Sequence, residues 1–273
     1  MPSKKIAHVL LDPSEQAKEF DRVKTEFVFI ASHQLRTPLT AIKLYLEMLL
    51  DDPAMTVLAE QTQFLKNIYR STNRMVQLVD DLLNVSRIEA GTLRVAPTPT
   101  NLKQFLLSIV NELEPMIKDK NGKVSVDCTH ITHPIMIDRQ LMHVVLHNLI
   151  TNALRYSQTN LCELSVRVKK IKNSDGTFVQ IGVADKGIGI SKKDQPHIFE
   201  KFYRSENAFR VQTDGSGLGL YIAKMIAGLS DCRLTFESKP HHGSVFYLTI
   251  PFTGSTQKNG TRLICAPNVT TDI

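Results

Sequence analysis

The stretch Phe27–Leu39 reads FVFIASHQLRTPL and decides how the N-terminal third of the chain folds. Apolar residues recur on one face of a predicted helix, and this otherwise core-forming segment carries the polar side chain of His33. Pro38 follows five residues later. It lacks a backbone N–H, and its ring clashes with the carbonyl of Gln34. We therefore expect a helix that bends just beyond His33 and leaves this histidine exposed beside the kink.

The residues after His33 favour a chemical role for it, although a single histidine on such a helix is more often an ordinary core or surface residue. Arg36 is a fixed cation suited to a phosphate, and Thr37 lies at i+4, where its hydroxyl can orient a water. The run HQLRTP resembles the phosphoacceptor box of sensor histidine kinases. The resemblance implies that His33 is phosphorylated from ATP and passes the phosphoryl group to an aspartate of a response regulator. Gln34 departs from the pattern, since that family usually has Glu or Asp there.

Around this stretch the sequence predicts two long helices. The first runs from about 15 to 50 and ends at Asp51-Asp52-Pro53, and the second has one apolar face from Val57 to Val85 and ends at a Gly91 cap. The short connection makes them antiparallel neighbours. Because two such stripes cannot bury each other alone, we expect a homodimeric four-helix bundle. The alternative is that the hairpin packs on its own C-terminal domain.

The rest of the chain alternates helical and strand patterns beyond a linker marked by Pro97 and Pro99. The expected class is α+β, with the helical hairpin followed by an α/β sandwich whose mixed sheet is mainly antiparallel. The expected domains are a lead-in at 1–14, the helical phosphoacceptor domain at 15–92, the sandwich at 93–253 and a disordered tail at 254–273. Helices are predicted at 101–119 (with a kink at Pro115), 138–155 and 217–229, and strands at 123–127, 134–137, 161–171, 177–184, 233–237 and 244–250.

One predicted helix of this domain carries two asparagines on a single face. Asn148, Asn152, Arg155 and Tyr156 lie at i, i+4, i+7 and i+8. Two neutral oxygen ligands suit a Mg²⁺ that takes most of its coordination from phosphates and water, and an arginine one turn on can neutralise a phosphate. By themselves such amides more often cap or bridge neighbouring helices.

Two glycine motifs follow. Asp185 ends a strand in DKGIG, and a carboxylate there can accept a hydrogen bond from the exocyclic amine of adenine. The run GSGLG, 215–219, opens a helix whose N-terminal amides are suited to a phosphate. Each motif is weak alone, because tight turns also require glycine.

The order of these motifs resembles the N, G1 and G2 boxes of the GHKL ATP-binding fold, with IFEKFYR at 198–204 resembling the F box of histidine kinases. The final glycine turn of that domain matches Gly243-Ser244. The resemblance covers about residues 20 to 252. It implies that the asparagines and Arg155 hold Mg²⁺ and phosphates, that Tyr156 and Asp185 hold the adenine, and that residues 186–215 form a mobile lid anchored by two phenylalanines. The implied catalytic residues are His33, Gln34, Arg36 and Thr37, and the implied ATP and Mg²⁺ site comprises Asn148, Asn152, Arg155, Tyr156, Asp185, Gly187, Gly189, Phe199, Phe202, Arg204, Gly215, Gly217, Leu218 and Gly219.

Composition limits the other classes. The net charge of +6 is modest for 273 residues, and the basic clusters lack interleaved aromatic residues, which argues against nucleic acid. Four cysteines without CxxC spacing, at 128, 162, 232 and 265, favour a reducing compartment, and we expect the cytoplasm. No apolar run reaches the ~18 residues of a membrane span. Either the protein is soluble or a sensory region lies outside this chain.

The sequence therefore predicts a homodimeric histidine kinase core that serves a response-regulator receiver domain. A GHKL hydrolase is disfavoured, because such enzymes place a glutamate four residues before the Mg²⁺ asparagine, where this chain has Asn148. A phosphatase-biased protein or an ATP-sensing scaffold stays open because of Gln34. Zinc at His143 and His147 is disfavoured, since the intervening residues are apolar and lack a glutamate base.

Overall fold

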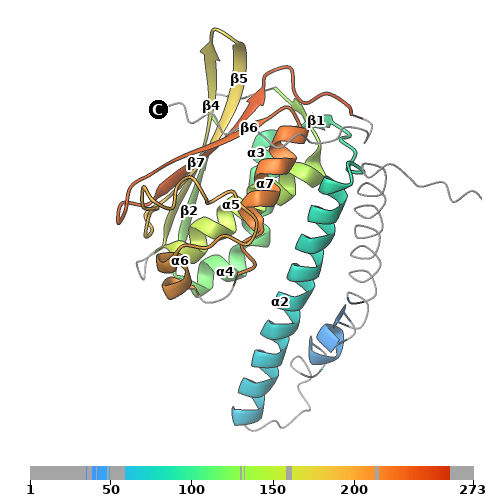
Figure 1. Cartoon of the computed structure of the whole chain (residues 1–273), viewed down its shortest axis with the longest axis vertical. Coiled ribbons are helices and arrows are strands. Elements are labelled where there is room, and N and C mark those ends of the chain that lie inside the picture. Colours follow the sequence, from blue (N-terminus) through green and yellow to red (C-terminus); the bar gives the residue numbers. More distant parts are fainter. Residues whose placement is uncertain are drawn as a thin grey trace, which may run out of the picture. The chain divides into compact units, whose positions relative to one another are not determined.

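The structure is a computed structural model (Figure 1). It describes residues 35, 39–40, 42–47, 49, 59–129, 131, 133–157, 162–212 and 215–258. The chain divides into two compact units between Thr92 and Leu93. Every strand among the described residues belongs to the second unit.

The first unit is helical, and its main described element is α2, Ala59–Glu89, which has 31 residues. Gly91 ends it with a positive φ of 63°, and the amide of Thr92 turns back to the carbonyl of Arg87 at 3.1 Å. This is the glycine cap that the sequence predicts, because a residue without Cβ adopts a left-handed conformation at little cost.

The preceding helical segment runs antiparallel to α2. Leu39 shares a buried apolar cluster with Val79 and Leu83, and the Tyr69 hydroxyl donates to Glu47 at 3.0 Å. Residues further along the first segment therefore contact residues nearer the start of α2. An antiparallel pair with an apolar seam is what the two predicted helical stripes require.

A second set of apolar side chains in this unit is exposed, with values between 37% and 66%. The helical pair buries only one stripe of each segment, so the exposed residues form an unpartnered surface within the unit. The exposed residues on the first segment are Leu35, Ile42, Leu44, Tyr45 and Leu49, and those on α2 are Phe64, Ile68, Met75 and Leu78.

The second unit is built on a five-stranded sheet in the order β2-β4-β5-β7-β6. The pairing of β2 with β4 is parallel and the other pairings are antiparallel, as expected for a mixed, mainly antiparallel sheet. Alternate residues along β4 and β7 are buried, so one face of the sheet contributes to the core. The strands are β2 Lys123–Asp127, β4 Glu163–Asn173, β5 Gly176–Asp185, β6 Arg233–Ser238 and β7 Ser244–Pro251.

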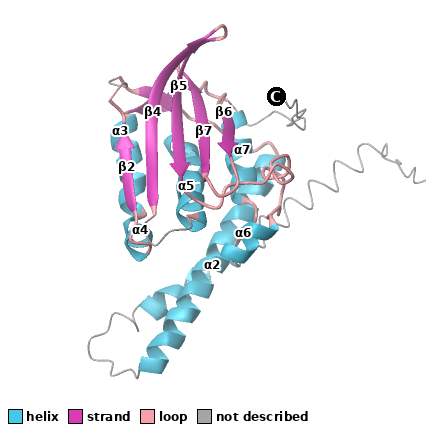
Figure 2. Ribbon diagram, turned by 90° about the vertical axis from the view of Figure 1, so that its left-hand side faces the viewer, coloured by secondary structure: helices cyan, strands magenta, loops and turns pink. Residues whose placement is uncertain are grey.

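Helices cover this inner face of the sheet (Figure 2). The helix predicted at 101–119 is two helices, because it breaks at Leu113 and Pro115 lies in the first turn of the second. The short helix α6, Glu206–Val211, was not predicted. The remaining helices are α3 Leu102–Glu112, α4 Glu114–Asp119, α5 Arg139–Tyr156 and α7 Gly219–Leu229.

Two segments outside the main sheet, the linker around Pro97 and Pro99 and the tail expected to be disordered, have backbone pairing that the sequence did not predict. The linker forms β1, Thr98–Thr100, which pairs with β3, Ile135–Ile137, in a small second sheet. The tail was expected to be disordered from residue 254, whereas Ser255 donates to the carbonyl of Met136 at 2.8 Å and Lys258 bridges to Val95. Backbone pairing with residues 35 to 39 positions away holds β1, and pairing with residues more than 100 positions away holds the tail. No local pattern reveals either pairing.

Candidate functional site

The helix α5 supplies one wall of the candidate site. Asp138 caps it, since its Oδ1 accepts from the amides of Gln140 and Leu141 at 3.0 and 3.1 Å. The apolar face of α5 is completely buried, which fixes its rotation. The four predicted residues on its other face, Asn148, Asn152, Arg155 and Tyr156, are each half-buried.

Asp185 ends β5 and is the acidic group of the site. The backbone amides of Gly187 and Ser244 both donate to its Oδ1, at 2.8 and 3.3 Å. Burial raises the pKa of this carboxyl from 3.8 to about 6, and the two amide hydrogen bonds only partly offset that effect. Among the described residues, neither donor to Asp185 uses Oδ2, so this oxygen remains as an acceptor for a ligand.

The end of α5 and the turn after β5 are in direct contact. Ser157 forms a β-bridge with Gly187, and the amide of Ile188 donates to the carbonyl of Tyr156 at 3.1 Å. A Cβ on Gly187 would lie 2.3 Å from the Tyr156 carbonyl oxygen, so only glycine fits there. The close packing brings the asparagine helix and the carboxylate of Asp185 to one place.

The second glycine of this turn packs on the β6–β7 connection. Gly189 lies against the carbonyl of Lys239, and the amide of His241 donates to the carbonyl of Ile188 at 2.8 Å. Gly243 lies against the backbone carbonyl of Asp185. The predicted final glycine turn therefore supports the carboxylate directly.

The start of α7 forms the opposite side of the asparagine face. The Oδ1 of Asn148 lies 3.0 Å from the place that a Cβ on Gly219 would take. Leu218 is completely buried and its amide donates to the Ser216 hydroxyl at 3.2 Å. The N-terminal amides of an eleven-residue helix thus lie beside the predicted Mg²⁺ ligand.

The F-box residues lie between these two glycine turns. The ring of Phe199 packs edge-on against Phe236 of β6, with centroids 5.7 Å apart, and the Lys224 ammonium of α7 lies 5.1 Å from it. The ring of Phe202 is 60% exposed, which differs from the expectation that both rings anchor the segment. The backbone of Phe202 instead contacts Gly217.

Arg204 is tied to the glycine loop. Its guanidinium donates to the carbonyls of Gly215, at 3.3 Å, and Gln212, and it lies 5.2 Å from the centroid of Phe209. The arginine thus holds the two ends of the segment around α6 together.

Ser191 and Asp194, which the sequence analysis missed, support the F box. The Tyr203 hydroxyl donates to Asp194 at 2.7 Å, and the Ser191 hydroxyl donates to the same carboxylate at 2.7 Å. The spacing Ser191-x-x-Asp194 is a local capping pattern and was a usable signal. Tyr203 belongs to the F-box motif, but nothing local indicates that Asp194 is its partner.

The phosphoacceptor box lies outside the described residues. This applies to His33, Gln34, Arg36 and Thr37, whose predicted roles stay predictions.

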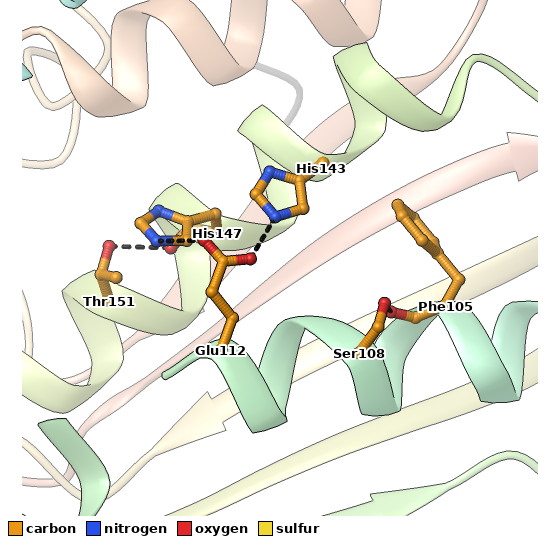
Figure 3. A network of polar contacts seen from close by, with 6 residues as sticks. All are labelled: Phe105, Ser108, Glu112, His143, His147 and Thr151. Atoms are coloured by element: carbon orange, nitrogen blue, oxygen red, sulfur yellow. Dashed lines mark hydrogen bonds and ion pairs between the residues drawn. The ribbon is translucent and has the colours of Figure 1, made fainter. Parts of the chain in front are cut away.

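The pair of histidines considered for zinc contacts a glutamate instead (Figure 3). His143 Nε2 lies 2.7 Å from one Glu112 oxygen, and His147 Nε2 lies 4.0 Å from the other. Burial lowers the pKa of His147. Within the described part of the chain, no group of three or more His, Cys, Asp or Glu side chains is arranged to hold a metal ion.

Fold and site together define a class. A helical hairpin precedes an α/β sandwich. In the sandwich the asparagine helix, the carboxylate turn and the glycine-opened helix converge, which is the arrangement of a GHKL ATP-binding domain.

Comparison with known proteins agrees with that class. Residues 23–91 match the family described as the His Kinase A (phospho-acceptor) domain, and residues 137–254 match the histidine kinase-, DNA gyrase B- and HSP90-like ATPase family. The histidine protein kinase SaeS of Staphylococcus aureus is 30% identical over 246 residues, which cover 90% of this chain and 69% of SaeS. The chain belongs to the histidine protein kinase family.

Other relatives are longer than this chain. Sensor histidine kinase WalK of Bacillus subtilis is 32% identical over 89% of this chain and 39% of WalK. Signal transduction histidine-protein kinase BarA of Escherichia coli is 27% identical over 90% of this chain and 26% of BarA. The chain thus spans about a quarter to two fifths of these relatives. No described helix is both long and apolar enough to cross a membrane.

Two solved structures share the fold. Full-length ShkA in complex with AMPPNP aligns with a TM-score of 0.66 at 23% identity, covering 86% of this chain and 47% of ShkA. The Acinetobacter baumannii histidine kinase AdeS aligns with a TM-score of 0.54 at 22% identity, covering 81% of this chain and 98% of AdeS. The expected fold class is confirmed by these alignments and by the two family matches.

Proposed function

We propose that this chain is the catalytic core of a two-component histidine kinase, which transfers the γ-phosphoryl group of ATP to His33. The observation that carries the proposal is the convergence of three sequence-distant elements on one site, namely Asn148 on α5, Asp185 at the end of β5 and Gly217–Gly219 at the start of α7. The phosphoryl group then passes to an aspartate on the receiver domain of a response regulator.

The site fits an adenine nucleotide. Asp185 presents a buried carboxylate oxygen that accepts a hydrogen bond from the exocyclic amine of adenine, whereas the guanine carbonyl at the same place would be repelled. Gly187 lets the turn that carries Asp185 pack on the end of α5, because a side chain there would collide with the Tyr156 backbone. Tyr156 and Gly189 complete the adenine side of the site.

The asparagine face serves the phosphate side. The carbonyl oxygens of Asn148 and Asn152 are hard, neutral ligands of the kind that Mg²⁺ accepts alongside phosphates and water, and Arg155 neutralises further charge. Bound Mg²⁺ would offset the negative charge on the transferring group. The amides at the start of α7, with Gly215, Gly217 and Gly219, bind the phosphates.

Transfer to His33 is mainly a matter of positioning. The neutral imidazole attacks the γ-phosphorus, the bond between this phosphorus and the β,γ-bridging oxygen breaks, and ADP leaves. Gln34 cannot accept the imidazole proton as a carboxylate would, but its carbonyl oxygen orients the ring in the nucleophilic tautomer. Arg36 steadies the phosphoryl group by its charge.

A second candidate function follows from the same box. Thr37 keeps the hydroxyl that orients a hydrolytic water, so dephosphorylation of the regulator survives the change at Gln34 better than kinase action does. A phosphatase-biased protein, or an ATP-sensing scaffold, is therefore the alternative.

The helical unit acts as a homodimer. Among its exposed apolar side chains, those of Phe64, Ile68 and Met75 are 46% to 66% exposed in a single copy. Such a surface on a helical hairpin is favourable when a second copy covers it, giving a four-helix bundle.

Labelling with γ-phosphate-labelled ATP tests the proposal. The unaltered chain should acquire label that is lost in acid and survives base, because phosphohistidine has that stability, and His33→Gln should abolish it while ATP still binds. Label that persists in His33→Gln would remove the proposed role of His33. Nucleotide binding without label would favour the scaffold, and loss of phosphate from a phosphorylated regulator would favour the phosphatase.

A further inference from the structure

The first part of the segment between β5 and α6, up to the F box, is attached to β6 at the edge of the sheet. The amide of Ile190 donates to the Ser238 hydroxyl at 2.8 Å, and the Gln195 side-chain amide donates to the Ser238 carbonyl at 3.2 Å. The ring of Phe199 rests on Phe236 of the same strand. This first part of the predicted lid is therefore attached to β6.

A buried carboxylate lies at the centre of the attached segment. Asp194 is only 7% exposed, and it accepts from the Ser191 hydroxyl through Oδ2 and from the Tyr203 hydroxyl through Oδ1, both at 2.7 Å. These donors, led by Ser191, lower the pKa of Asp194, so the carboxylate stays charged. The hydrogen bond to Tyr203 joins positions nine residues apart.

Tyr203 follows a residue with an unfavourable backbone conformation. Phe202 has a φ of 61°, in the left-handed region that a bulky side chain rarely adopts. Such a conformation persists only where the surrounding contacts hold it. Beside it, the Tyr203 hydroxyl donates to Asp194, and the guanidinium of Arg204 donates to the carbonyls of Gly215 and Gln212.

The backbone of Phe202 forms the wall behind the phosphate loop. Its Cα, carbonyl carbon and carbonyl oxygen lie 2.8, 2.7 and 2.9 Å from the place that a Cβ on Gly217 would take. Gly217 itself has a φ of 70°. The position of this glycine is therefore set by the conformation of Phe202.

We infer that Asp194 and Tyr203 form a latch that holds the Phe202 backbone against Gly217 and thereby positions residues 215–219 for the phosphates of the nucleotide. The inference rests on the proposed function. Both latch residues are positioning residues that act through Phe202. The latch is specific for the phosphate side, because the adenine carboxylate Asp185 is held by Gly187 and Ser244 instead.

The test compares Tyr203→Phe with a matched control, Tyr247→Phe. Both changes remove a hydroxyl that donates to a carboxylate, since the hydroxyl of Tyr247, on β7, donates to Glu237 at 3.3 Å. Dissociation constants of the full chain for ATP and for adenosine are measured by competition against a fluorescent ATP analogue with excess Mg²⁺. Tyr203→Phe should weaken ATP binding about tenfold, the order expected for one hydrogen bond to a charged group. Adenosine binding should change less than about twofold, and Tyr247→Phe should change neither.

A double variant separates the latch from a general structural effect. Asp194→Ala should weaken ATP binding at least as much as Tyr203→Phe does, because it also removes the acceptor of the Ser191 hydroxyl. Adding Tyr203→Phe to Asp194→Ala should cost no further ATP affinity, because the Tyr203 hydroxyl then has already lost its acceptor. Equal losses for ATP and adenosine, additive losses, or unchanged ATP affinity in Tyr203→Phe would each overturn the latch. Failure of the unaltered chain to bind any nucleotide would instead remove the proposed function, and the latch with it.

Discussion

Replacing Asp185 by asparagine should stabilise the folded protein at neutral pH while it removes adenine binding. The carboxyl is buried at the end of β5, and burial raises its pKa from 3.8 to about 6. An ionised group in that place opposes folding, because the unfolded chain solvates it better. Asparagine keeps an oxygen for the amides of Gly187 and Ser244 but carries no charge.

The size of the effect follows from the two pKa values. The difference between 3.8 and about 6 corresponds to about 3 kcal/mol at 1.36 kcal/mol per pKa unit. Because the folded pKa is the higher one, this contribution to stability is fully present below about pH 4 and is lost as the pH rises through about 6. Loss of charge-assisted hydrogen bonds offsets part of the gain, so we expect Asp185→Asn to raise the free energy of unfolding at pH 7.5 by about 1 to 3 kcal/mol.

Urea denaturation followed by circular dichroism, between pH 4 and 8, measures this contribution. The difference in stability between the unaltered chain and Asp185→Asn should grow across that interval and level off above about pH 7. Asp175→Asn, which removes a carboxylate at the exposed β4–β5 turn, is the control with which the Asp185→Asn difference is compared. A variant less stable than the unaltered chain at pH 7.5, or a difference that does not vary with pH, would refute the reasoning.

Three further predictions concern the two units. Gly187→Ala should weaken ATP binding at least about 100-fold, because its Cβ would lie 2.3 Å from the Tyr156 carbonyl oxygen. The control Gly228→Ala, where a Cβ meets nothing within 4 Å, should bind ATP normally. Equal ATP affinities of the two variants would exclude the close packing of Gly187 on Tyr156. Gln34→Glu should raise the rate of His33 labelling at saturating ATP by about 10²-fold if general-base loss dominates, and an unchanged rate would mean that orientation already suffices. Met75→Glu should shift the chain toward monomer in sedimentation, since this side chain, 46% exposed in a single copy, would carry a charge into the four-helix bundle of the dimer. A dimer of unchanged stability would place the dimer interface elsewhere.

Local sequence determined most of the secondary structure of this protein and the identities of its predicted site residues. The apolar stripes of the hairpin and the Gly91 cap each depend on residues a few positions apart, so periodicity and cap chemistry reveal them. The asparagine spacing and the glycine runs are local for the same reason. Their order along the chain carried the resemblance to a family that the comparisons then confirmed.

The tertiary structure decided which of these residues meet and what supports them. Ser244 donates to Asp185 from 59 positions away, and Gly219 packs on Asn148, because sheet pairing and helix packing bring separate segments together. The β1–β3 pairing, the attachment of residues 254–258 and the Tyr203–Asp194 hydrogen bond arise in the same way. No sequence period records them, since each depends on a contact that exists only after the chain has folded. The exposure of Phe202 was decided there too, because the backbone of that residue, rather than its ring, fills the space beside Gly217.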